Sequence, residues 1–246
     1  PGQSRAATPR RAVFLTVRLD QFVATATALS RREAKQAITR GRVRVDSHPC
    51  RGANTQIDSD ARVTLDNATL TLPGERYLML NKPAGVVSAT TDNDHPTVLD
   101  LLPAATARGL HIAGRLDADT TGLVLLTTDG RWSHRITSPR VECPKTYRVS
   151  LSEAVADEAL QQLESGVTLR NDPKPTKPAS IRRLGDREIE LTISEGRYHQ
   201  VKRMLAAVGN HVLALHRQRI GTIELDPALA PGAFRELTDA EINNVV

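Results

Sequence analysis

Residues 111–130, HIAGRLDADTTGLVLLTTDG, place an acidic segment between two apolar runs. The first run breaks at Gly114, and the second, Leu-Val-Leu-Leu at 123–126, ends in a turn at 128–130. Short apolar runs that are bounded by glycine and polar residues indicate fully buried strands. The sequence therefore predicts a loop with one arginine and two aspartates, held between two interior strands as a rigid mount for chemistry.

The composition narrows the class of protein. The chain has 246 residues, of which 39% are hydrophobic, a formal net charge of +5 and an isoelectric point near 9.6. This length allows one large domain and a small one, and the positive charge favours a polyanionic partner. No apolar run approaches the roughly 18 residues of a membrane span, and no apolar stretch follows the basic N-terminus as in a signal peptide. We therefore expect a cytoplasmic protein that has no membrane partner.

The first part of the chain is predicted to form a small module at 16–72, preceded by a disordered basic tail at 1–15. Apolar residues with helical spacing over 19–26 predict one helix. The segment Ser-Arg-Arg-Glu at 30–33 is a capping box that opens a second helix. Val-Arg-Val at 43–45 then alternates as a strand.

This order of a helix, a capped helix and a Gly-Arg-Val-Arg-Val strand resembles the S4 RNA-binding domain. The resemblance implies that basic residues of the second helix and the strand form a positive face that contacts RNA phosphates. These candidate RNA-binding residues are Arg31, Arg32, Lys35, Arg42 and Arg44. Phosphate contacts position a protein on RNA but carry no base information. The alternative is a charged helix that is merely solvated.

A larger domain is predicted at 77–246, after a short linker at 73–76. A short helix is expected directly after Pro96. The other predicted strands and helices, in chain order, are 77–80, 123–126, 132–137, 145–151, 153–164, 189–193, 198–208, 212–215 and 222–225, followed by a short helix that begins at 238. Many strands with few helices, in no regular βαβ rhythm, predict an α+β fold with a mixed, mostly antiparallel sheet flanked by helices.

Three motifs in this larger part resemble one family. They are GRLDADTTGL around Asp117, KTY ending at Tyr147, and ISEGRYHQVKRM at 193–204. Together with the S4-like module, they resemble the bacterial rRNA pseudouridine synthases of the RsuA type over nearly the whole chain. The resemblance implies the pseudouridine synthase fold and an indispensable catalytic aspartate at Asp117.

The same resemblance implies roles for two further side chains. Tyr147 matches the family's active-site tyrosine, whose ring can stack on the uracil and whose hydroxyl is placed for a proton transfer. Arg115 matches a position associated with filling the gap that an extruded nucleotide leaves. An ion pair between Arg115 and Asp119 is the alternative.

A pocket that stacks a base opposes the ionisation of Asp117, because desolvation favours the neutral acid. In the wider family an arginine restores the charge, but here HQVKRM puts Lys202 at that position, and lysine supplies a point charge instead of a bidentate fork. Arg203 is the alternative partner. His199 lies on the same side of the predicted helix and is a further candidate for substrate binding.

The implied reaction breaks the N1–C1′ bond of uridine and joins C5 to the same carbon. An ionised carboxylate can serve as a nucleophile at C1′, or as a base that takes the C2′ proton toward a glycal, and both routes stay open. The target nucleotide has to leave its stack first. No redox change occurs and no group is imported, so the reaction needs no cofactor, and no metal-ligand pattern is present in the sequence.

Two segments, DTTGLVLLTTDGRWSHRITSPR and TISEGRYHQVKRMLAAVGNHV, resemble the small-subunit branch of the family, which modifies uridine 516 of 16S rRNA. This implies 16S rRNA within a partly assembled 30S particle as the partner of a monomeric enzyme. The alternatives are a synthase acting on 23S rRNA, a non-catalytic S4-type ribosome-assembly protein, and a phosphatase of the HAD type. The phosphatase is suggested by Asp-Ala-Asp-Thr-Thr at 117–121, but it needs a parallel sheet and a bound metal.

Overall fold

The computed structural model describes residues 16–58 and 61–245. The chain divides into two compact units, of which the first ends at Gly74 and the second begins at Glu75. The basic tail predicted at 1–15 lies outside the described residues.

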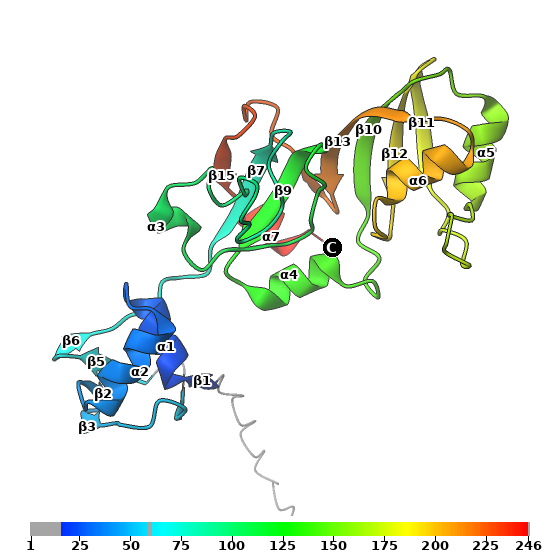
Figure 1. Cartoon of the computed structure of the whole chain (residues 1–246). Coiled ribbons are helices and arrows are strands. Elements are labelled where there is room, and N and C mark those ends of the chain that lie inside the picture. Colours follow the sequence, from blue (N-terminus) through cyan, green and yellow to red (C-terminus); the bar gives the residue numbers. More distant parts are fainter. Residues whose placement is uncertain (1–15, 59–60, 246) are drawn as a thin grey trace, which may run out of the picture. The chain divides into compact units, whose positions relative to one another are not determined.

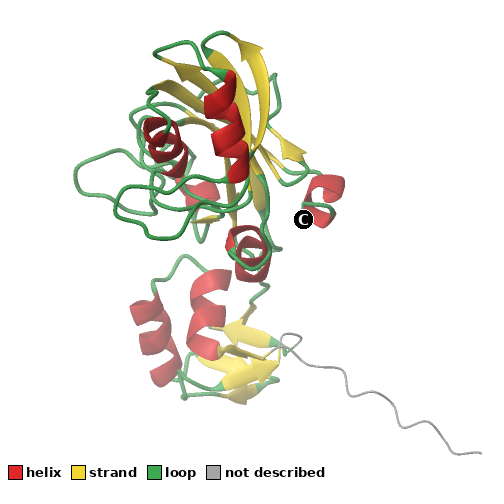
Figure 2. Cartoon of the chain, turned by 90° about the vertical axis from the view of Figure 1, so that its right-hand side faces the viewer, coloured by secondary structure: helices red, strands yellow, loops and turns green. Residues whose placement is uncertain are grey.

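The first unit packs two helices against two small antiparallel sheets. Figure 2 shows the helices side by side, with the short strands next to them. The helices are α1 (Leu19–Ala26) and α2 (Arg31–Thr39). One sheet pairs β1 (Thr16–Arg18) with β4 (Gln56–Asp58), and the other has the order β3 (His48–Pro49), β2 (Val43–Val45), β5 (Val63–Leu65) and β6 (Ala68–Thr69).

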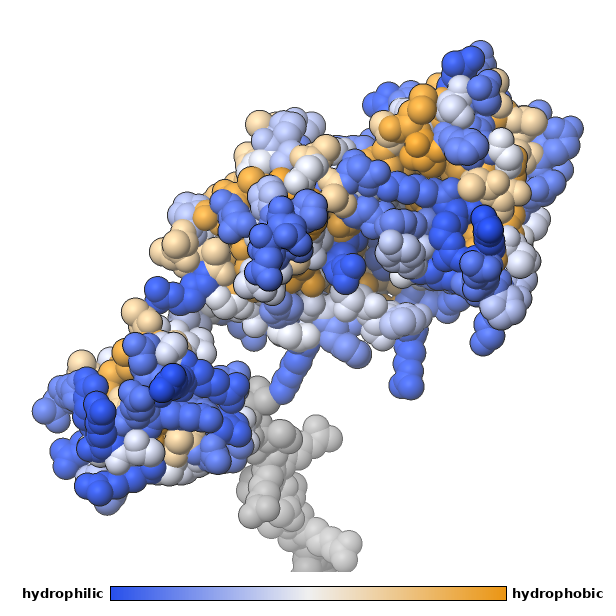
Figure 3. All heavy atoms as spheres, viewed as in Figure 1, coloured by the Kyte–Doolittle hydropathy of each residue, from blue (hydrophilic) through white to orange (hydrophobic). Residues whose placement is uncertain are grey.

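Local sequence explains why these helices form where they do. The predicted capping box is confirmed at the start of α2, because Ser30 accepts from the backbone of Glu33 while the Glu33 carboxylate accepts from the backbone of Ser30. The apolar stripes of both helices face the core of this unit, which includes Leu19, Phe22, Val23, Ala34, Ala37, Ile38 and Val43. Hydrophilic residues cover most of the face of this unit that Figure 3 displays.

The second unit is built on one large sheet, confirming the predicted α+β fold. Its strand order is β11 (Ser180–Gly185), β12 (Glu188–Ile193), β10 (Lys145–Leu151), β13 (Val212–Ile220), β9 (Thr121–Thr127), β7 (Tyr77–Lys82) and β15 (Phe234–Glu236). In addition, β14 (Ile223–Glu224) pairs with β13, and β8 (His111–Ile112) pairs with β9. The helices are α3 (Ala104–Ala107), α4 (Gly130–Thr137), α5 (Asp157–Ser165), α6 (Gln200–Ala207) and α7 (Asp239–Asn243).

The sheet has a seam where β9 meets β13. These two strands run parallel and share only the paired positions His216 with Thr121 and Arg217 with Gly122, while the other pairings among the described strands of this unit are antiparallel. A sheet that is antiparallel on both sides of this seam does not fit the parallel sheet of a HAD-type phosphatase.

Apolar layers cover both faces of the sheet. Along β9, residues 123–126 are fully buried, as predicted, and alternate side chains enter two separate clusters. Val124 and Leu126 join the cluster that α5 and α6 cover, whereas Leu123 and Leu125 join the cluster that α4 covers. Figure 1 shows α5 and α6 beside β10, β11 and β12, and α4 beside β9.

Four predicted helices differ from the structure. The helix expected at 153–164 begins at Asp157, because the backbone N–H of Val155 donates to the carbonyl of Asp186, and the helix expected at 132–137 begins at Gly130, after the cap that Asp129 provides. The helix expected directly after Pro96 is wrong: Thr97 and Asp100 form a turn through their side chains, and the helical turn comes later, at α3. The helix expected from 198 begins two residues further on, because His199 adopts a left-handed conformation (φ 47°, ψ 38°) as the residue before α6.

Candidate active site

The acidic loop between β8 and β9 is fixed by contacts from another part of the chain. The backbone N–H of Gly85 donates to the carbonyl of Ala118 at 2.8 Å, and that of Leu116 donates to Ser88 Oγ at 3.0 Å. Lys82 Nζ donates to the same carbonyl of Ala118 at 3.1 Å. These bonds hold the backbone on both sides of Asp117 in place.

Lys82, the last residue of β7, is a fully buried cation beneath this loop. Besides Ala118, it donates to the carbonyl of Pro83 at 2.8 Å. Burial lowers the pKa of Lys82 to about 8, while the charges of Asp119 and Asp117 act in the opposite direction. Its local sequence, Asn-Lys-Pro-Ala-Gly, indicates only a turn, because the burial depends on the pairing of β7 with β9.

A glycine and an arginine join β9 to β13 at the seam. Gly122 has a φ of +101°, and a Cβ on it would lie 2.3 Å from the carbonyl oxygen of Arg217. Arg217 is only 2% exposed. Its guanidinium donates to the carbonyls of Leu123, Gly114 and Arg115 at 2.8, 2.9 and 3.2 Å. The buried cation thus fixes both the start of β9 and the start of the acidic loop.

Arg217 was missed in the sequence because the strand predicted at 212–215 ends before it. In the structure β13 continues to Ile220. Leu215 and Arg217 are both buried, two positions apart on one face of this strand. The run His-Arg-Gln-Arg at 216–219 contains no apolar residue, so no local pattern could have placed Arg217 inside.

Asp117 lies between two basic side chains. Its carboxylate is 33% exposed, with Lys202 Nζ 3.5 Å from Oδ2 and His199 Nε2 3.5 Å from Oδ1. Lys202 Nζ lies closer to Asp119, at 2.6 and 2.8 Å from its two oxygens. Its hydrogen bond lowers the pKa of Asp119, while burial acts in the opposite direction. Lys202 therefore forms ion pairs with both carboxylates of the loop.

Of the two cations considered as partners of Asp117, the structure brings Lys202 to it. Arg203 instead donates to the carbonyl oxygens of Tyr198 and Arg170, at 3.2 and 2.7 Å. It therefore braces the segment before α6.

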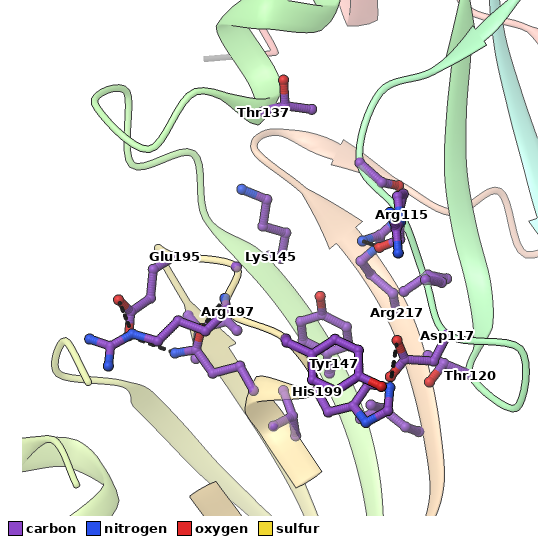
Figure 4. A pocket seen from close by; sticks show the side chains of 18 of the residues that line it. Arg115, Asp117, Thr120, Thr137, Lys145, Tyr147, Glu195, Arg197, His199 and Arg217 are labelled. Carbon is purple, nitrogen blue, oxygen red and sulfur yellow. Dashed lines mark hydrogen bonds and ion pairs between the residues drawn. The ribbon is translucent and has the colours of Figure 1, made fainter. Parts of the chain in front are cut away.

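A cleft of about 560 Å³ opens beside the acidic loop. Tyr147, on β10, is 8% exposed and lines its wall. Figure 4 shows Asp117, Tyr147 and His199 close together, with the dashed line joining Asp117 and His199. Arg115 also lines the cleft and is exposed, and its guanidinium has no partner among the described residues. The alternative ion pair with Asp119 is therefore wrong, because Lys202 occupies that carboxylate.

Cations outnumber carboxylates around this cleft. Lys145 donates to the carbonyls of Cys143 and Ile136, at 2.7 and 3.5 Å, and burial lowers its pKa. The cationic side chains that line the cleft are Arg115, Lys145, Arg197, Lys202 and Arg217, and the carboxylates are Asp117 and Glu195. This balance suits a polyanionic substrate.

In the first unit, part of the predicted basic face surrounds one buried carboxylate. Asp20 is fully buried and pairs with Arg18 at 2.9 Å, Arg31 at 3.5 Å and Lys35 at 3.9 Å. The hydrogen bond from Arg18 lowers the pKa of Asp20. The carboxylate orients these three basic side chains and neutralises part of their charge.

The remaining basic residues of this face differ in their pairing. Arg42 forms an ion pair with Asp66. Arg32 and Arg44 are exposed and have no ionic partner among the described residues. Arg32 and Arg44 are therefore free to meet phosphates.

Two further properties of the described residues bear on the site. Within 16–58 and 61–245, no three His, Cys, Asp or Glu side chains are grouped as metal ligands. In the same part of the chain, no helix is both long and apolar enough to cross a membrane.

Comparisons with known proteins agree over most of the chain. Residues 76–207 match the family described as RNA pseudouridylate synthase, and residues 17–63 match the S4 domain. Proteins described as "Ribosomal small subunit pseudouridine synthase A" are 53% identical in Escherichia coli (strain K12) and 46% identical in Haemophilus influenzae, each over 94% of this chain and 100% of the relative. A crystal structure of a pseudouridylate synthase, 45% identical, superimposes with a TM-score of 0.69 over 94% of this chain and 100% of that one.

Proposed function

Because the chain belongs to the RNA pseudouridylate synthase family, we propose that it isomerises one uridine of small-subunit ribosomal RNA to pseudouridine. The observation that carries this proposal is the position of Asp117, in a cleft where a buried tyrosine and two basic side chains accompany it. We infer uridine 516 of 16S rRNA, within a partly assembled 30S particle, as the target of a monomeric enzyme. A ribosomal substrate of this kind assigns the protein to the cytoplasm.

Asp117 is the catalytic carboxylate in this proposal. Lys202 Nζ and His199 Nε2 each lie 3.5 Å from a carboxylate oxygen of Asp117, so both side chains are placed to orient it toward the substrate. The anion either adds to C1′ as the N1–C1′ bond breaks or takes the C2′ proton. In the first route, C5 of the freed and turned uracil displaces the Asp117 carboxylate from C1′. In the second, C5 adds to C1′ of the glycal and Asp117 returns the proton to C2′. In both routes C5 then loses its proton and N1 gains one.

Tyr147 and Arg115 handle the extruded nucleotide. Tyr147 is almost fully enclosed in the cleft wall, where its ring can stack on the target uracil. Arg115 is exposed at the same cleft and has no partner in the described part of the chain, so it is available to enter the gap in the RNA stack. Extrusion costs a few kcal/mol, and a guanidinium that stacks in the gap offsets part of this cost.

The other basic residues bind the RNA around the target. Residues 16–72 act as the RNA-binding domain, through Arg31, Arg32, Lys35, Arg42 and Arg44, and residues 77–246 act as the catalytic domain. Arg203 braces the segment before α6 and assists substrate binding through it. The reaction moves one bond within the substrate and calls for no cofactor.

The proposal is tested by Asp117→Asn with rRNA labelled with tritium at uridine C5. We expect RNA affinity to stay near wild type and tritium release to fall by about 10⁴-fold or more. Asp119→Asn is the matched control, because it makes the same charge change in the same loop; we expect it to lose about tenfold through Lys202. Turnover retained in Asp117→Asn would discard the catalytic assignment.

The target is tested by mapping pseudouridine in 16S and 23S rRNA from a strain that lacks the protein. Loss confined to position 516 of 16S rRNA is the expected result. Loss at a site in 23S rRNA would assign the protein to the large subunit, and an unchanged map would favour a non-catalytic assembly role.

A further inference from the structure

Two aromatic rings form a stack at the cleft, and one of them, His199, contacts the catalytic carboxylate of the proposed reaction. The rings of Tyr198 and His199 lie 3.7 Å apart, centroid to centroid, at an interplanar angle of 20°. Both residues line the cleft. Tyr198 is 73% exposed, more than any other large hydrophobic residue in the part of the chain that the structure describes. Its outer face is therefore open to a ligand.

The backbone beneath this stack is held in a strained state. His199 adopts a left-handed conformation with a φ of 47°, which costs a residue other than glycine about 1–2 kcal/mol. The turn persists because Gln200, only 4% exposed, accepts from the backbone of Arg197 at 2.8 Å and donates to Glu195 at 2.6 Å. A stack of two exposed rings stabilises the fold too little to offset this strain. Backbone strain of this kind is typical of functional sites.

The difference in exposure between two tyrosines indicates which base the stack meets. The target uracil has to be enclosed with its C1′ beside Asp117, and Tyr147, 8% exposed, belongs to that interior. Tyr198, 73% exposed, can instead be reached by a nucleotide that stays outside the pocket. Extruding the target also removes one stacking neighbour from each flanking base, so a protein ring can replace what was lost.

We propose that the Tyr198–His199 stack is a platform for the nucleobase directly next to the target uridine, on its 5′ or its 3′ side. This inference rests on the proposed function. His199 meets Asp117 through Nε2 and supports Tyr198 through its ring face, so one residue links the flanking base to the catalytic carboxylate. Stacking on an aromatic ring accepts any base and is typically worth about 5- to 150-fold in affinity.

The first test compares variants on a 16S rRNA transcript that contains the mapped target uridine. Tyr198→Ala and Tyr198→Leu should raise KM about tenfold with kcat within twofold of wild type, because only the platform is lost. Tyr198→Phe keeps the ring and should match wild type. Leu213→Ala is the matched control, since Leu213 is 70% exposed and does not line the cleft. A wild-type KM in Tyr198→Ala, or a fall in kcat alone, overturns the platform.

The second test is a double-mutant cycle between protein and RNA. Transcripts carry an abasic nucleotide on the 5′ or the 3′ side of the target. We expect the abasic site on one side to abolish the difference between wild type and Tyr198→Ala. Additive effects on both sides overturn the platform while leaving the synthase proposal intact. A wild-type protein that makes no pseudouridine on the unmodified transcript, either free or assembled into a partial 30S particle, overturns both.

Discussion

The two units use their cations in opposite ways. In the first unit, Arg31, Arg32 and Lys35 are exposed on α2, and their only carboxylate partner among the described residues is Asp20, beneath Arg31 and Lys35. In the second unit, Lys82 and Arg217 are buried and donate to backbone carbonyls. We propose that the exposed cations set the affinity for RNA, whereas the buried cations hold the backbone of the acidic loop in place.

The largest loss of stability is expected at Gly122, where β9 and β13 approach each other too closely to accept a side chain. Gly122→Ala puts a Cβ 2.3 Å from the carbonyl oxygen of Arg217, at a φ of +101°. Backbone strain and displacement of β13 together should destabilise the protein by about 4 kcal/mol, measured by urea unfolding. Gly114→Ala is the control: its φ is +102° but nothing lies within 4 Å, so it should cost about 1–2 kcal/mol. Equal losses would contradict the close approach at the seam.

A second effect follows from the burial of Lys82. Between its lowered pKa of about 8 and its ordinary value of 10.5, the unfolded chain keeps a proton that the folded protein has released. Because the unfolded state binds more protons there, the free energy of unfolding should rise with pH across this window, by about 3 kcal/mol relative to Lys82→Met. Urea unfolding of both proteins from pH 8 to 10.5 measures this, and parallel curves would show that Lys82 is not a buried cation.

The smallest effect is expected on the exposed face of the first unit. Changing Arg31, Arg32 and Lys35 together to alanine should weaken RNA binding and reduce its salt slope by about 2 to 3, from three lost phosphate contacts. Arg182 and Arg183 provide the control pair, because they are ion-paired with Glu190 and Asp157 in the second unit. Their double alanine variant should keep the wild-type slope. An unchanged slope in the triple variant would remove the contrast between the units.

Elements that depend on nearby residues could be predicted from the sequence. The capping boxes Ser30–Glu33 and Thr238–Glu241 correctly mark the starts of α2 and α7, since all their bonds are made within one turn. The alternation along 145–151 gives β10 with its correct bounds, because one face of that strand is buried.

Features that depend on strand pairing could not be predicted in this way. Lys82 and Arg217 are buried only because β7, β9 and β13 are neighbours, which no local pattern states. The meeting of Asp117 with Lys202, which lie 85 positions apart, came from the resemblance and not from spacing. That Lys202 bonds more closely to Asp119 was visible only in the structure.

The seam between β9 and β13 has a consequence for how the cleft keeps its shape. Only two register pairs connect the two halves of the sheet there, so the backbone ladder alone forms a narrow bridge. The Arg217 side chain extends from β13 across this seam and donates to the carbonyls of Leu123 and Gly114, so it connects the two halves of the sheet. We therefore expect the two sides of the cleft to keep their spacing when RNA binds, so that the RNA and not the protein changes conformation.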